Sequence, residues 1–259
     1  MQQQPPYQVF VINLDRSPER WDGLSARLHQ LGLAAERVSA TDGKGRLPAE
    51  FPEFDAAGYA RCHGRTPMAT EIGCYLSHVR VLEKFLAGDK EFAIVLEDDA
   101  ILCDDFALAV SDLVAFRSEW DLILLFGVHG GGPVRLTKTA TQHWISALTL
   151  RQTGSTAYMV KRACAAQLLK NLLPMRVPYD HAYTLPWIHG LRMRACLPYP
   201  VPAQQSGPST IGWLERKRPA PLQRLRVLWY RTKTETSRVW HYLVKDPVII
   251  RALFRRRSA

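Results

Sequence analysis

The hydrophobic residues of the chain gather in short runs without polar alternation. This pattern is typical of strands that are buried on both faces of a mostly parallel sheet. Five runs predict strands: residues 7–14, 92–96, 120–127, 155–160 and 191–199.

Between these runs, apolar residues recur at helical spacing. One helix is predicted to begin at Ser17 and Pro18 and to stop near Gly32. Two more are predicted over residues 70–88 and 161–173. Strands that alternate with helices indicate an α/β sandwich.

Two segments fit neither pattern. Residues 41–68 are rich in glycine, proline and charge, and we expect a long loop there with little regular structure. The glycines of GVHGGG, residues 127–132, predict a mobile or tightly turning loop.

The charge of the chain is concentrated at its end. The 259 residues carry a net charge of +10, with 47% hydrophobic and 22% charged residues, which is typical of a globular protein. Residues 1–213 hold equal numbers of basic and acidic side chains, so residues 214–259 carry the whole excess. We therefore expect one domain over 1–213 and a basic, amphipathic, helical tail over 214–259.

The tail mixes arginines with Trp, Tyr, Leu, Ile and Phe, and Asp246-Pro247 is a good helix start. This mixture favours adsorption to an anionic membrane surface. The alternative is a solvated basic helix packed on the body. Nucleic-acid binding fits less well, and we expect no nucleic-acid partner.

The cysteines and the N-terminus bear on the compartment. Five cysteines, widely spaced and odd in number, favour a reducing compartment. The first residues lack the pattern of a signal peptide, and no apolar run reaches the ~18 residues of a membrane span. We expect a cytoplasmic protein.

The clearest chemical signal is Glu97-Asp98-Asp99, which directly follows the run at 92–96. Ligands of open α/β sheets bind at the carboxyl ends of strands, and adjacent carboxylates repel one another unless a cation or solvent relieves them. Mg²⁺ and Mn²⁺ sites that handle phosphates use one or two protein carboxylates. The triplet predicts a metal site, although such triplets also occur in solvated loops.

Several segments resemble glycosyltransferase family 25, the lipooligosaccharide and collagen galactosyltransferase family. They occur in the family's order and cover most of residues 7–212: VFVINLDRSPER, EIGCYLSH, VLEDDA, GSTAYMVKRACAAQLL, VPYDH and a late Gln followed by STI. The resemblance implies a GT-A-like fold, which is a single Rossmann-type α/β/α sandwich. It also implies transfer of a sugar from a nucleotide donor.

The resemblance further assigns roles to the acidic residues. Asp99 would coordinate Mn²⁺, or Mg²⁺, bound to the donor diphosphate, while Glu97 would face the ribose or make structural contacts. Asp180 would be a second metal ligand or the base that inversion requires, and His181 would contact the same phosphates or the metal. The sequence leaves the base open among four residues: Asp98, Asp104, Asp105 and Asp180.

A further set is expected to bind the donor. Asn13 would read the uracil, and Arg16 or Arg20 would bind a phosphate. The alternatives for these positions are a helix-surface salt bridge at Arg20 and a satisfied core residue at His78, and the sequence favours both alternatives. The full set is Asn13, Leu14, Arg16, Arg20, Ser77, His78, Glu97, Gln205, Ser209 and Thr210.

Together these features predict an inverting, metal-dependent hexosyltransferase. Its donor would be UDP-galactose or UDP-glucose, and its acceptor a lipid-linked saccharide of the lipopolysaccharide or lipooligosaccharide core. It would lie on the inner face of a bacterial inner membrane. Two alternatives remain: a metal-dependent nucleotide phosphohydrolase, and a non-catalytic membrane adaptor that acts through its tail.

Overall fold

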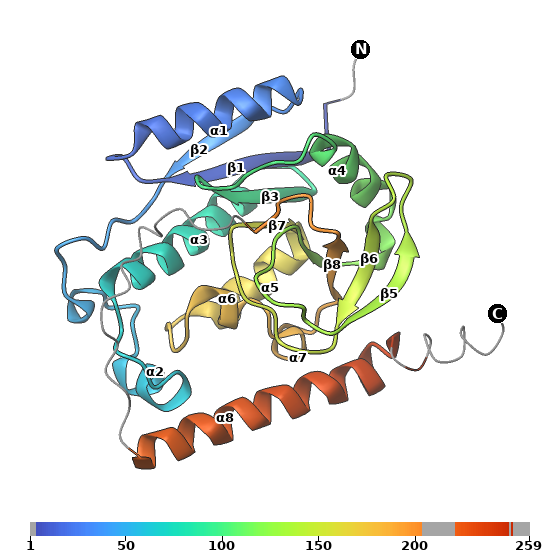
Figure 1. The fold of residues 1–259 in the computed structure, drawn as a ribbon. Helices are drawn as coiled ribbons and strands as arrows, with labels where there is room; N and C mark the ends of the chain where they lie inside the picture. Colours follow the sequence, from blue (N-terminus) through green and yellow to red (C-terminus); the bar gives the residue numbers. More distant parts are fainter. Residues whose placement is uncertain (1–3, 204–220, 249, 251–259) are drawn as a thin grey trace.

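The structure is a computed structural model that describes residues 4–203, 221–248 and 250 (Figure 1). Its centre is a sheet in the order β2-β1-β3-β7-β4-β8-β6-β5. The strands are β1 Tyr7–Asn13, β2 Ala35–Ser39, β3 Phe92–Glu97, β4 Leu122–Leu124, β5 Pro133–Lys138, β6 Trp144–Leu148, β7 Ala157–Lys161 and β8 Met193–Leu197.

The prediction of a mostly parallel sheet is wrong. In the described sheet β1 pairs in parallel with β2 and β3, and β4 with β8, whereas the other four pairings are antiparallel. The apolar run of β3 is buried on both faces as expected, yet one neighbour, β7, runs the opposite way. A continuous apolar run reports burial and carries no information about the direction of the neighbouring strand.

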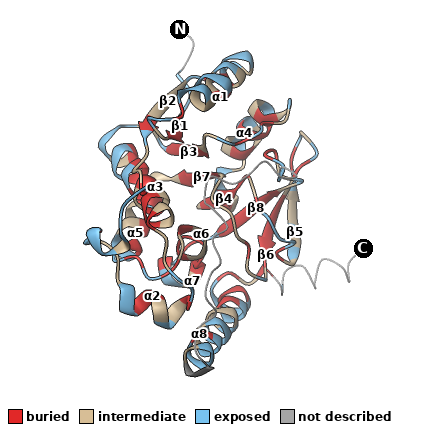
Figure 2. Ribbon diagram, turned by 60° about the vertical axis from the view of Figure 1, so that its left-hand side comes forward, coloured by how far each residue is buried: buried red, intermediate tan, exposed pale blue. Residues whose placement is uncertain are grey.

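Helices cover both faces of the sheet, which gives the predicted α/β/α layering (Figure 2). Along β1, Phe10 and Ile12 enter one core with α3, α5 and α6, while Val9 and Val11 enter the other with α1 and α4. This alternation follows from the period of two in a strand. The helices are α1 Pro18–Gln30, α3 Ala69–Ala87, α4 Phe106–Ala115, α5 Arg162–Leu172 and α6 Tyr179–Ala182.

The segment 41–68 is more ordered than predicted. It contains a short 3₁₀ turn, Pro48–Glu50, and helix α2, Ala56–Cys62. The carboxylate of Asp55 caps α2 by accepting a hydrogen bond from the backbone N–H of Gly58 at 2.7 Å. The capping residue was visible in the sequence, but the helix after it is too short to show a periodic pattern.

The tail helix α8, Pro221–Trp240, lies along the body beside α2 and the short helix α7, Pro186–His189 (Figure 1). It continues into a π-helical turn, His241–Lys245. The predicted helix start at Asp246-Pro247 leads into residues that are mostly outside the described part. The predicted boundary at 213/214 also lies outside it, so that division stays a prediction. None of the described helices combines the length and the apolar character that a bilayer span requires.

Candidate active site

The acidic triplet lies where the strand pairing predicts a ligand edge. β1 and β3 run in parallel with Ile12 opposite Glu97, so Asn13 and Asp98 leave the sheet side by side. Because β7 is antiparallel to β3, the segment that enters it, including Ser155, reaches the same edge. Three separate parts of the chain therefore meet around the carboxylates.

A hollow of about 100 Å³ opens at this edge, between the triplet, the β1–α1 connection and the start of α3. Seven of the predicted site residues line it: Leu14, Arg16, Arg20, Ser77, Glu97, Asp98 and Asp99. Sequence reasoning missed other lining residues: Thr41, Asp42, Gly43, Thr70 and Cys74.

Two glycines allow the missed loop to reach α3. A Cβ at Gly43 would lie 2.0 Å from the carbonyl oxygen of Ala69, and one at Gly73 would lie 2.3 Å from that of Thr41. Only glycine permits backbones to approach this closely. The signal for this wall of the hollow was thus present in the Thr41-Asp42-Gly43 turn and in Gly73.

Asp98 is held in place by two predicted donor-binding residues. Its Oδ2 accepts a hydrogen bond from Asn13 Nδ2 at 2.7 Å, and its Oδ1 pairs with Arg20 Nη1 at 3.1 Å. Asn13 is 1% exposed, and it also donates to the Ser17 carbonyl at 2.8 Å and accepts from Arg37 Nε at 2.8 Å. With both amide hydrogens used inside the protein, Asn13 is better suited to fix Asp98 than to read a base.

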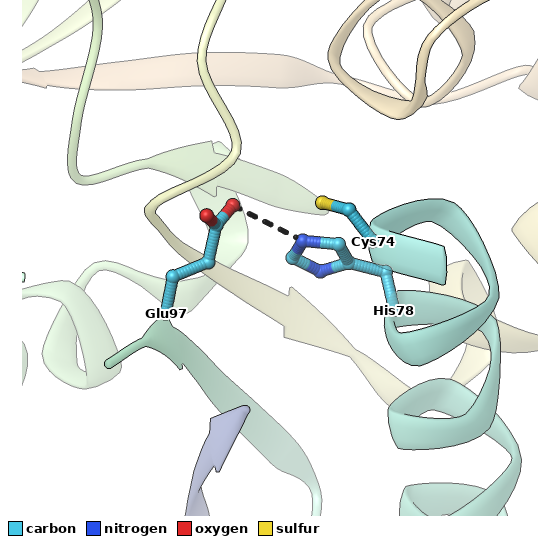
Figure 3. Close-up of side chains that lie close together, drawn as sticks. All are labelled: Cys74, His78 and Glu97. Atoms are coloured by element: carbon cyan, nitrogen blue, oxygen red, sulfur yellow. Dashed lines mark hydrogen bonds and ion pairs between the residues drawn. The ribbon is translucent and has the colours of Figure 1, made fainter. Parts of the chain in front are cut away.

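Glu97 is fixed by a buried network that starts on α3 (Figure 3). Its Oε1 is 3.2 Å from Nε2 of His78, and it accepts a hydrogen bond from Ser155 Oγ at 2.5 Å. Nδ1 of His78 lies 3.3 Å from the hydroxyl of Tyr158, and the His78 ring stacks on Tyr179 at 4.1 Å.

This network sets the protonation of Glu97. Burial by itself raises the pKa of Glu97, but the His78 imidazole and the Ser155 hydroxyl outweigh it and hold that pKa below its ordinary value. His78 is fully buried, so its geometry favours positioning Glu97 over touching a donor. Ser77 likewise ties elements together: it donates to the Gly73 carbonyl at 2.7 Å and accepts from the Thr41 N–H at 2.8 Å.

Asp99 differs from its two neighbours. No hydrogen bond or ion pair to another described residue engages its side chain, although it lines the hollow. The residue as a whole is exposed to solvent, although the protein atoms around it still limit the hydration of its carboxylate. Burial raises the pKa of Asp99 to about 6, and the charges of Glu97 and Asp98 add to the rise.

These acids fit a hard divalent cation. The free carboxylate of Asp99 and the second oxygen of Glu97 are oxygen donors, which Mn²⁺ and Mg²⁺ prefer. The repulsion that raises the Asp99 pKa is of the kind that a bound cation relieves. Only one or two protein carboxylates are needed when a phosphate supplies the remaining ligands.

A second possible ligand set lies beside it: the Cys74 sulphur, the His78 imidazole and the Glu97 carboxylate are within 4.8 Å of one another (Figure 3). Burial raises the pKa of Cys74 well above its ordinary value, and the negative charges of Glu97, Asp180 and Asp99 raise it further. The thiol therefore stays protonated. The His78 nitrogens already face Glu97 and Tyr158. A neutral thiol and an engaged imidazole suit Mn²⁺ less well than the carboxylates do.

Asp180 lies on α6, within the electrostatic field of the same cluster. Its Oδ2 accepts the Gly154 N–H at 3.1 Å, and burial, together with the charge of Glu97, raises its pKa. The Nε2 of His181 is 4.0 Å from Oδ1 of Asp180. Burial and four nearby arginines lower the pKa of His181 to about 3, so its imidazole is neutral.

The other candidates for the base are engaged elsewhere. Asp104 has a fully exposed side chain that pairs with Arg27, and Asp105 lies 3.0 Å from Nε2 of His143. Neither lines the hollow, and Asp180 and His181 do not line it either. Arg16, at the mouth of the hollow, pairs with Asp42 at 2.7 Å, and both side chains are more than a third exposed. The predicted residues Gln205, Ser209 and Thr210 lie outside the described residues.

Comparison with known proteins agrees with this arrangement. The model of glycosyltransferase family 25 (LPS biosynthesis protein) matches residues 7–131, which include β1, the start of α3 and the triplet. A protein of Aedes aegypti named glycosyltransferase 25 family member is 30% identical over 184 residues, which is 66% of this chain and 29% of that protein. Residues 7–131 thus form a glycosyltransferase family 25 domain.

Other family 25 relatives carry different names. Human inactive glycosyltransferase 25 family member 3 is 28% identical over 185 residues, 65% of this chain and 30% of that protein. Mouse procollagen galactosyltransferase 2 is 27% identical over 126 residues, 46% of this chain and 20% of that protein. The chain thus matches no more than three tenths of the length of these three relatives.

Proposed function

We propose that this protein is an inverting, metal-dependent hexosyltransferase that takes galactose or glucose from a UDP-sugar. One observation carries the proposal: the carboxylate of Asp99, which has no partner among the described residues, lies in a hollow that Arg16 and Arg20 also line. A free acid for a cation, with guanidinium groups next to it, suits a nucleoside diphosphate.

The residues of the hollow have distinct roles in this proposal. Asp99 holds Mn²⁺ or Mg²⁺, and the His78 network keeps Glu97 ionised and oriented toward the same ion or the ribose. The bound cation would neutralise charge on the departing diphosphate. Arg16 exchanges its exposed partner Asp42 for a phosphate, which costs little because exposed ion pairs are weak. Arg20 and Asn13 hold Asp98.

Asp180 is the base in this proposal. Its raised pKa favours proton uptake, and it lies near the acidic cluster without an ion pair to Lys or Arg among the described residues. Asp98 is less suitable, because Asn13 and Arg20 already engage its two carboxylate oxygens. Proton uptake from the acceptor hydroxyl then accompanies a single displacement at the anomeric carbon.

The acceptor in this proposal is a lipid-linked saccharide, of the lipopolysaccharide or lipooligosaccharide kind, at the cytoplasmic face of a membrane. The outward side of α8 supports it. Leu225, Trp229 and Trp240 are 63%, 72% and 64% exposed on a helix whose other side packs on the body. Exposed basic side chains accompany them: Arg226, Lys233 and Lys245. Aromatic, aliphatic and basic groups on one exposed face suit an anionic lipid surface.

The test is UDP release from a panel of UDP-sugars, with Mn²⁺ or with EDTA, first without an acceptor and then with lipooligosaccharide. Release from one hexose donor that requires Mn²⁺ and increases with acceptor supports the proposal. Free sugar or inorganic phosphate as the end product in the presence of acceptor would instead support a phosphohydrolase.

A second candidate function is a non-catalytic membrane adaptor. It is favoured by the relatives whose names include the word inactive and by the exposed face of α8. The adaptor predicts vesicle binding with neither UDP release nor binding of any UDP-sugar.

A further inference from the structure

Three arginines from separate parts of the chain converge beside α6. Arg65 follows α2, Arg151 lies between β6 and β7, and Arg231 is on α8. Arg151 and Arg231 line a narrow hollow of about 20 Å³ with His181. Arg65 and Arg231 line an adjoining, wider hollow of about 370 Å³, and His63 borders both.

These arginines lack a paired carboxylate in the described part of the chain, although the charge of Arg151 acts on Asp180. The carboxylate that lines the narrow hollow, Glu235, lies 3.5 Å from Nε of Arg238. Asp180 is the other nearby acid, and its contacts are His181 and the Gly154 N–H. No described carboxylate forms an ion pair with Arg65, Arg151 or Arg231.

The positive charges of the cluster act on one another. Burial lowers the pKa of Arg231, and the charges of Arg151 and Arg65 lower it further. Arg65 and Arg231 are exposed to solvent and Arg151 is partly buried, so an anion can reach the guanidinium groups. A bound anion would relieve their mutual repulsion.

We propose that Arg65, Arg151 and Arg231 form a binding site for a phosphate or carboxylate group of the acceptor saccharide. Arginine binds both groups through paired N–H donors, and the wider hollow leaves room for a group larger than phosphate. The assignment to the acceptor rests on the proposed function and on the position of the cluster. Through His181 it adjoins Asp180, the proposed base, whereas Arg16 and Arg20 border Asp99.

The site also uses the tail of the chain. Arg231 belongs to α8, whose opposite side carries the exposed tryptophans. A helix on a lipid surface would thus bring one wall of the anion site close to the headgroups. A membrane-anchored acceptor with a phosphate or carboxylate near its sugar would meet the arginines and Asp180 together.

The test is calorimetric titration of the full chain with inorganic phosphate, comparing wild type, Arg231→Gln and Arg151→Gln. Each substitution is expected to weaken phosphate binding about tenfold, as loss of a charge-assisted contact should. Arg226→Gln is the matched control, because Arg226 is exposed on the same helix and lines neither hollow. Thermal melts check that every variant is folded.

Phosphate binding that is absent, or that Arg226→Gln weakens equally, would overturn the site. UDP release without acceptor separates acceptor from donor: an unchanged KM for the UDP-sugar in Arg231→Gln supports the proposal, and a raised KM assigns the arginines to the donor and overturns it. Failure of the proposed function is distinct, because it would leave phosphate binding intact while no UDP-sugar is turned over.

Vesicles of phosphatidylcholine with phosphatidylglycerol distinguish the two sources of phosphate. Unchanged vesicle binding of Arg231→Gln, with weakened phosphate binding, supports a group on the acceptor saccharide. Loss of vesicle binding equal to that of Trp229→Ser would make the cluster a headgroup site and would overturn the assignment to the saccharide.

Discussion

At the scale of single residues, the three adjacent acids have three different environments. Asp98 is paired with Asn13 and Arg20, Glu97 is held by His78 and Ser155, and Asp99 has no side-chain partner among the described residues. Two of the carboxylates are therefore fixed within the protein, and the third is the one that we propose as the metal ligand. Preorganised neighbours of this kind keep a metal ligand in position.

Asp180 has two proposed roles that one substitution separates. If Asp180 is the base, Asp180→Asn should slow transfer to the acceptor by about 10²- to 10⁴-fold, because the proton of the acceptor hydroxyl loses its carrier. Mn²⁺ affinity, measured by electron paramagnetic resonance in the presence of UDP, should stay the same. A parallel loss of Mn²⁺ affinity would instead make Asp180 a metal ligand. Asp105→Asn is the control, since Asp105 is paired with His143.

The sequence predicted which residues gather at this site better than it predicted what each does. Arg16, Arg20 and Asp99 could be placed because they follow strands of one sheet edge. The bracing role of Asn13 depends on Arg37, a residue of a strand that the sequence analysis did not find. Such pairings between distant segments are tertiary contacts, which a local pattern does not contain.

At the scale of elements, α8 has two unlike sides. Its inward side includes Val227, Arg238 and the following Tyr242, all buried, and Arg238 donates to the Thr184 carbonyl at 3.1 Å. Its outward side bears the exposed tryptophans. The two expectations for the tail, packing on the body and adsorption to a membrane, are therefore compatible in one helix, and the packing is present (Figure 2).

We predict that Trp229→Ser/Trp240→Ser lowers binding to anionic vesicles by about tenfold, because two aromatic groups no longer enter the interface. The measurement is co-sedimentation with vesicles of phosphatidylcholine with and without phosphatidylglycerol. Leu108→Ser is the control, since Leu108 is a 62% exposed apolar residue on α4. Equal binding of the double variant and wild type would show that this face does not adsorb to lipid.

The hydrophobic pattern did not predict β2, β5 and β6, and the reason is their place in the sheet. The strand β2 and the hairpin of β5 and β6 lie toward the two edges of the sheet, and β2 and β5 are only partly buried. Edge strands need fewer apolar residues, so their runs are weak. The helix α4 has a helical pattern, since its buried residues Phe106, Ala109, Val110 and Leu113 recur at helical spacing directly after the acidic segment.

At the scale of the whole molecule, a buried ion pair fastens the end of the chain to the sheet. Arg194 of β8 donates two hydrogen bonds to Asp246, at 2.5 and 3.0 Å, with side chains that are 3% and 6% exposed. The contact has a specific geometry, because two nitrogens of one guanidinium group bind the two oxygens of one carboxylate. The ion pair holds the end of α8 and the π-helical turn in contact with the sheet.

Breaking this pair should be costly. We predict that Asp246→Ala lowers the free energy of unfolding by about 3–5 kcal/mol, because it leaves the Arg194 guanidinium buried without a partner. Urea denaturation followed by tryptophan fluorescence measures the change. The double variant Arg194→Met/Asp246→Leu should recover most of the loss, whereas a loss below that of an ordinary surface substitution would mean that the tail is not docked in solution.

The account as a whole depends on Asp99 and a divalent cation. The most direct test is Mn²⁺-dependent UDP release from the preferred UDP-sugar by wild type, Asp99→Asn and Asp104→Asn. Asp104 is the matched control, because its side chain is fully exposed. We predict EDTA-sensitive release by wild type and Asp104→Asn, and a loss on the order of a hundredfold or more for Asp99→Asn. Full Mn²⁺-dependent release by Asp99→Asn would contradict the assignment of the metal to this carboxylate.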